Sequence, residues 1–182
     1  HGATEAFFRD RGTASLDSDI AVVCGEELNS FFRHQCVHGV GHGLMAWTSY
    51  ELLDALDLCD LLEPTGNRLS CYSGVFMENV VGGLSGSMGH YSEYLSEDPH
   101  FPCNILEERH VASCYFYQRS RMVQLFNGDF EKLAAACAEA PYVAQRECFE
   151  SMGRDRRECD PRHARAGYSL LAPTSPISRT AS

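Results

Sequence analysis

The sequence lacks any long apolar run, since no stretch approaches the roughly 18 apolar residues that a membrane-spanning helix requires. It also has no charged and then apolar leader at its start, so we expect a mature or trimmed chain without a membrane span. Positive charge is scarce: 15 Lys and Arg stand against 25 Asp and Glu, a net charge of −10. Because this balance repels nucleic acid, we expect no nucleic-acid partner.

Several functional motifs are missing as well. The nine cysteines form neither C-x-x-C nor C-x-x-C-H, which argues against a zinc finger and against a covalently attached c-type haem. A glycine-rich stretch begins at Gly82, but no Gly-Lys-Ser/Thr accompanies it, so a phosphate-binding loop has little support. Gly39 follows His38 where a zincin peptidase has its catalytic glutamate, which argues against that enzyme class.

Eight of the cysteines fall into four pairs of similar spacing: Cys24 and Cys36, Cys59 and Cys71, Cys103 and Cys114, and Cys137 and Cys148. The members of a pair stand 12, 12, 11 and 11 residues apart, and the first members recur at intervals of 35, 44 and 34 residues. Such a period is typical of two-helix repeats. We predict four disulfides and a periplasmic or extracellular location, because cytosolic thiols are kept reduced.

Helix signals accompany the pairs. The segment from Ser49 to Cys59 is apolar at helical spacing, and Asn127-Gly128 ends one helix before Asp129 caps the next, which leads to Cys137. Each first cysteine is therefore expected to end a helix, and each second cysteine to lie in the first turns of the following one. The predicted fold class is all-α: about four antiparallel helical hairpins in an α-solenoid-like array, each pinned by a disulfide.

The spacing of the cysteine pairs also divides the chain into segments. We predict an N-terminal segment (1–16), a repeat domain (17–157) with an insertion at about 82–102 that explains the longest interval, and an extended C-terminal tail (158–182). Cys159 has no partner in this scheme. It opens a truncated fifth unit, stays a free thiol, forms an intermolecular bridge or pairs with Cys148; the sequence does not choose. A protein partner or a homo-oligomer is expected, through Cys159 or the tail.

In period and layout, residues 17–157 resemble the Sel1-like and tetratricopeptide repeat families, in particular their cysteine-rich secreted members that staple each helical hairpin. The resemblance implies a scaffold of stacked hairpins, an architecture that often binds partners.

The first repeat differs from the others by three histidines, His34, His38 and His42, spaced at i, i+4 and i+8. On a helix with Cys36 at zero they fall at about 160°, 200° and 240°, a stripe opposite the disulfide. One interpretation makes His34 a surface residue and the other two core histidines bonded to backbone carbonyls. The other makes the stripe a ligand set for zinc, copper or iron, or for a non-covalent haem.

Further ligands are sought in the second repeat and the insertion. Glu78 is either a ligand or a solvated helix charge or cap, and His90 is either the third ligand or part of a simple flexible linker. Gly41 is expected to let a ligand approach the backbone, within a pocket formed by Gly39, Gly41, Gly43, Tyr72, Met77 and Tyr91. Met77 stands six residues after Cys71, as His42 does after Cys36, and is alternatively a core residue. His1 forms a copper brace if it is a processed terminus.

Two functions follow from this pattern. The first is an extracytoplasmic helical-repeat binding or scaffold protein with a histidine metal or haem site, which the sequence favours. The alternative is a metal-dependent hydrolase or oxidoreductase built on His38 and His42, with Glu78 or His90 completing a centre that keeps one coordination position open.

Overall fold

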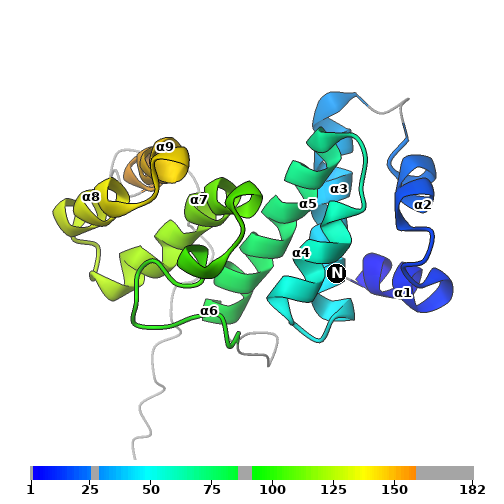
Figure 1. The fold of residues 1–182 in the computed structure, drawn as a ribbon, viewed down its shortest axis with the longest axis horizontal. Coiled ribbons are helices and arrows are strands. Elements are labelled where there is room, and N and C mark those ends of the chain that lie inside the picture. Colours follow the sequence, from blue (N-terminus) through cyan, green and yellow to red (C-terminus); the bar gives the residue numbers. More distant parts are fainter. Residues whose placement is uncertain (1, 26–28, 86–91, 159–182) are drawn as a thin grey trace, which may run out of the picture.

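The computed structural model describes residues 2–25, 29–85 and 92–158, and the regular structure in these ranges is entirely helical, which confirms the all-α fold class. The elements are α1 (Gly2–Arg11), α2 (Leu16–Val23), α3 (Ser30–Trp47), α4 (Leu52–Asp60), α5 (Thr65–Met77), the π-helical turn η1 (Glu78–Gly82), α6 (Gly83–Ser85), the 3₁₀ turn η2 (Cys103–Ile105), α7 (Glu108–Leu125), α8 (Phe130–Glu139) and α9 (Tyr142–Glu158). They follow one another from α1 and α2 at one end of the long axis to α8 and α9 at the other (Figure 1). Over the described ranges, no helix combines the length and the apolar character needed to cross a membrane.

All four predicted disulfides are present, with Cα atoms 5.6–5.7 Å apart. The second cysteine is the seventh residue of its helix in α3, α5, α7 and α9 alike. Among the first cysteines, Cys59 and Cys137 lie in the last turns of α4 and α8, and Cys24 directly follows α2. Cys103 is the exception, because it lies in η2 rather than at the end of an α-helix. There the expectation that each first cysteine ends a helix is wrong, since the insertion occupies the place of that helix.

The predicted helix boundary before α8 is confirmed. Asn127 and Gly128 both have positive φ, 51° and 75°, the left-handed conformation that ends helices. The carboxylate of Asp129 then accepts hydrogen bonds from the backbone N–H groups of Glu131 (3.1 Å) and Lys132 (3.2 Å). This cap satisfies two donors that the first turn of a helix otherwise leaves free.

The second half of the insertion is fastened to α7. The amide of Gln118, which is fully buried, donates to the carbonyls of Pro99 (3.2 Å) and Phe101 (2.7 Å). Arg121 donates through Nε (2.9 Å) and Nη2 (2.8 Å) to the carbonyl of Ser96. The predicted sites at His1, His90, Tyr91 and Cys159, and the tail beyond residue 158, lie outside the described residues.

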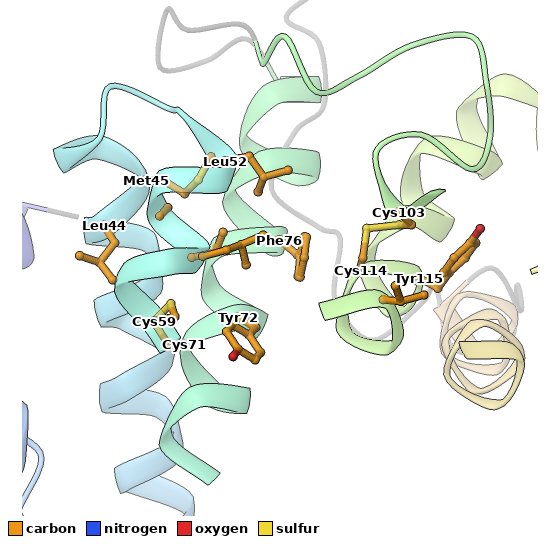
Figure 2. Close-up of a cluster of buried hydrophobic side chains, with 14 of the residues drawn as sticks. Leu44, Met45, Leu52, Cys59, Cys71, Tyr72, Phe76, Cys103, Cys114 and Tyr115 are labelled. Carbon is orange, nitrogen blue, oxygen red and sulfur yellow. A yellow bond between two sulfur atoms is a disulfide. The ribbon is translucent and has the colours of Figure 1, made fainter. Parts of the chain in front are cut away.

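The core runs through the middle of the helix series. Figure 2 shows buried side chains from α3 (Leu44, Met45), α4 (Leu52) and α5 (Phe76) gathered above the Cys59–Cys71 bond. The N-terminal segment joins this core through α1, whose Phe8 is fully buried. A Cβ on Gly43 of α3 would lie 2.6 Å from the Cβ of Thr4, so α1 packs directly on the backbone of α3.

Candidate functional site

Two glycines let α3 and α5 cross in backbone contact. A Cβ on Gly41 would lie 2.1 Å from the carbonyl oxygen of Cys71, and a Cβ on Gly74 would lie 2.0 Å from the carbonyl oxygen of His38. No side chain larger than hydrogen fits at either position. The expectation that Gly41 leaves an opening for a ligand is therefore wrong, because the backbone of α5 fills that space. The same crossing brings the histidine face of α3 onto α5.

Each histidine of the stripe is held through its Nδ1 atom by an oxygen of α5 or η1. His34 Nδ1 lies 2.8 Å from Ser70 Oγ, His38 Nδ1 2.7 Å from Ser73 Oγ, and His42 Nδ1 2.7 Å from Glu78 Oε2. The interpretation in which backbone carbonyls bind these imidazoles is thus wrong for the Nδ1 atoms. Instead, a side-chain oxygen forms a hydrogen bond with Nδ1 of each of the three imidazoles, which lie on successive turns of α3.

The direction of these hydrogen bonds follows from the serine protons. Ser70 Oγ donates its hydrogen to the carbonyl of Gly66 (2.8 Å), and Ser73 Oγ donates its hydrogen to the carbonyl of Ser70 (2.7 Å). A hydroxyl carries one hydrogen, so both serine oxygens can only accept from the imidazoles. The carboxylate of Glu78 likewise accepts. All three histidines therefore carry their ring proton on Nδ1 and, when neutral, present a lone pair at Nε2.

The Nε2 atoms of His38 and His42 lie 3.0 Å apart. Two lone pairs facing each other at this distance repel unless a positive centre lies between them, either a proton or a metal ion. Burial, and next the neighbouring His42 and His34, lower the pKa of His38 to about 4. His38 is consequently neutral at pH 7, and its Nε2 lone pair faces Nε2 of His42, where a proton or a metal ion can bind.

Glu78 directly follows α5 and is the first residue of η1, a type of turn that occurs frequently at functional sites. Its backbone keeps α-helical dihedral angles (φ −64°, ψ −45°), and its N–H donates to the carbonyl of Gly74, four residues earlier. The helix α5 therefore still sets the direction of Glu78, whose carboxylate reaches Nδ1 of His42. Glu78 is 4% exposed, so the interpretation as a solvated helix charge is wrong. Its neighbour Asn79 is also buried and accepts a hydrogen bond from Ser92 Oγ in the insertion.

The predicted pocket does not form as proposed. Gly41 and Gly43 are covered by α5 and α1, whereas a Cβ on Gly39 would meet nothing within 4 Å. Met77 is partly buried at the end of α5. The structure gives Tyr72 a different role: its hydroxyl donates to Asp60 rather than to any histidine of the stripe.

Tyr72 belongs to a second polar cluster that sequence reasoning missed, centred on Asp60 at the end of α4. Asp60 accepts from Tyr72, from Arg109 Nε (2.8 Å) and from His110 Nε2 (3.3 Å). Although burial alone raises the pKa of the Asp60 carboxyl, these hydrogen bonds lower it below its ordinary value. The cluster ties α4 and α5 to α7, and its arginine makes it unsuited to a cation. An Arg-His pair at the start of a predicted helix was the available signal.

Within residues 2–25, 29–85 and 92–158, no group of three or more His, Cys, Asp or Glu side chains is arranged to hold a metal ion. The candidate site is therefore the pair of imidazoles of His38 and His42, whose Nδ1 atoms are held by Ser73 and Glu78. Searches against protein-family models, curated proteins and solved structures find no match for this chain.

Proposed function

We propose that this protein is an extracytoplasmic binding protein that holds one transition-metal ion between Nε2 of His38 and Nε2 of His42. The contact of 3.0 Å between these two atoms carries the proposal. With metal–nitrogen bonds of about 2.0 Å, two ligands stand roughly 2.8 Å apart in adjacent corners of a square plane and roughly 3.3 Å apart in a tetrahedron. The observed separation lies between these values, so Zn²⁺ and Cu²⁺ both suit the pair.

The groups behind the imidazoles support the same function. Metal-binding histidines commonly donate their second ring N–H to a carboxylate or another oxygen, which fixes the tautomer and the direction of the free lone pair. Ser73 and Glu78 act in this way on His38 and His42. The net charge of −10 adds a long-range attraction for cations.

The geometry favours a bare ion over a haem and binding over catalysis. The two axial positions of a haem lie on opposite faces of the porphyrin, and imidazoles that meet at 3.0 Å leave no room for the ring between them. The carboxylate of Glu78 is engaged at Nδ1 of His42, across the ring from Nε2, where it orients a ligand. A base acting on metal-bound water would need to lie on the Nε2 side.

The four disulfides fit an oxidising compartment, the periplasm or the cell exterior. We also propose that the helices form an α-solenoid-like stack of antiparallel hairpins, as in the Sel1-like and tetratricopeptide repeat proteins. This stack would serve as a rigid support on which α5 fixes the imidazoles of α3. The remaining coordination positions are then open to solvent or to a partner that delivers or receives the ion.

The test is metal binding by the untagged, metal-free protein with its disulfides intact. Equilibrium dialysis against Zn²⁺ and, separately, Cu²⁺ should load about one ion per chain, and His38→Ala and His42→Ala should each lose it. His100→Ala is the matched control, because His100 is also partly buried and also bonded through Nδ1, to Tyr115 (2.9 Å). Absence of stoichiometric binding, or equal binding by the three variants, contradicts the proposal.

A further inference from the structure

His34 stands in the same arrangement as the pair but takes no part in its contact. Its Nδ1 donates to Ser70 Oγ (2.8 Å), just as that of His38 donates to Ser73, and both serines are fixed by backbone carbonyls of α5. An exposed imidazole ordinarily samples several rotamers, and holding it in one costs conformational entropy. The fixed direction of the Nε2 lone pair at this exposed position therefore favours a role for His34 as a ligand over that of an ordinary surface residue.

The three imidazoles form a row that leads inward. Successive histidines rise by about 6 Å along α3. His34 is exposed, His38 and His42 are partly buried, and Glu78 is 4% exposed. The ring centroids of His34 and His38 are 6.0 Å apart, against 4.8 Å for His38 and His42. The first spacing suits stepwise exchange of an ion between neighbours, and the second suits joint binding.

We infer that His34 is the capture ligand through which a transition-metal ion reaches and leaves the His38–His42 pair; the inference rests on the proposed function. An ion from solvent first binds Nε2 of His34. In the next step a bond forms from Nε2 of His38 to the ion, and then the bond from His34 breaks. His42 completes the final site. Each step exchanges one neutral nitrogen ligand for another, and a proton held between the two Nε2 atoms of the pair leaves to solvent as the ion enters, so no electron is transferred.

The kinetics of loading test this role. A capture ligand absent from the final site speeds entry and exit by the same factor, so it changes both rate constants and leaves Kd unchanged. Stopped-flow mixing of the untagged protein with Cu²⁺, followed by the d–d absorption band, gives the association rate. Excess chelator gives the dissociation rate. His34→Ala should slow both at least about threefold, because a captured ion is at a high effective concentration next to the pair.

Two further variants sharpen the result. Ser70→Ala keeps the imidazole but removes its fixed orientation, so it should slow both rates by a smaller factor. Gln35→Ala changes the exposed neighbour on the same helix and should leave both rates at the wild-type values.

The outcomes separate the two proposals. If wild type and His34→Ala bind Cu²⁺ with the same rates, the capture role is refuted while the pair site stands. If His34→Ala weakens Kd as strongly as His38→Ala, His34 is a ligand of the final site and the capture role is again refuted. If wild type binds no Cu²⁺ or Zn²⁺, the proposed function itself fails.

Discussion

A single methyl group added at the crossing of α3 and α5 should damage both the fold and the site. In Gly41→Ala the new Cβ would lie 2.1 Å from the carbonyl oxygen of Cys71 and 2.8 Å from the backbone nitrogen of Val75. Non-bonded carbon contacts are favourable at about 3.5–4.0 Å, so the two helices must move apart by roughly 1 Å or more. Backbone atoms cannot rotate away as a side chain can.

The magnitude follows from two opposing effects. Overpacking of this kind typically costs about 1–3 kcal/mol, while alanine gains up to about 1 kcal/mol over glycine within a helix. Gly39→Ala is the matched control, because it lies on the same helix and its Cβ would meet nothing within 4 Å. It should stabilise the protein by about 0.5–1 kcal/mol. The propensity gain is common to both variants, so we expect Gly41→Ala to be less stable than Gly39→Ala by roughly 1–3 kcal/mol.

Urea unfolding followed by far-UV circular dichroism, with the disulfides intact, measures this difference. Thermal melting should show it as a gap of about 2–12 °C in Tm, at roughly 2–4 °C per kcal/mol for a chain of this size. Gly41→Ala should also bind Zn²⁺ more weakly, because separating the helices lengthens the bonds from His38 to Ser73 and from His42 to Glu78. Equal stability of the two variants would refute the backbone contact on which the site depends.

Three other consequences follow. Ser73→Ala should weaken Zn²⁺ binding about 10–100-fold by titration, since His38 loses its orienting partner, whereas Ser120→Ala should not; equal affinities would remove Ser73 from the site. The metal-free protein should lose about 1–2 kcal/mol of stability as pH falls from 6.5 to 4, a figure reduced for solvent screening of a half-exposed imidazole. Stability falls in this window because the unfolded chain takes up a proton at His38, whereas the native state, in which the pKa of His38 is lowered to about 4, does not. His38→Gln should flatten this part of the stability profile measured by urea unfolding. A profile unchanged by the substitution would contradict the assignment to His38. Replacing Cys137 and Cys148 together by alanine should cost about 3 kcal/mol in urea unfolding, the loop-closure value for a separation of 11 residues, and a loss below about 0.5 kcal/mol would show that this bond is not a stabilising staple.

The helices and disulfides could be predicted from the sequence because their signals are local. The cysteine spacing restricts which disulfides can form. The end of a helix at Asn127-Gly128 and the N-cap at Asp129 depend on three adjacent residues. Cys103 escaped the pattern because an insertion removes the helix that the spacing implied. The antiparallel stacking of hairpins stays a prediction.

The histidine stripe was also visible in the sequence, but its partners were not. A helical projection of α3 cannot tell which residues of α5 face it, because the close backbone contact at the glycines of the crossing sets that register. The sequence pattern consequently predicts that Gly41 lets a ligand approach the backbone and that Tyr72 lines the pocket. In the structure, Gly41 contacts the backbone of α5, and Tyr72 donates a hydrogen bond to Asp60. Ser73 stands 35 residues after His38, the same interval as between Cys24 and Cys59, yet nothing in one sequence showed that its oxygen accepts the Nδ1 proton.

X-ray absorption of the stoichiometric Zn²⁺ complex in solution tests the His38–His42 site most directly. The account predicts two imidazole nitrogens at about 2.0 Å from the metal, with the outer-shell scattering of two rings. A first shell containing sulfur, or one with no imidazole, would contradict it.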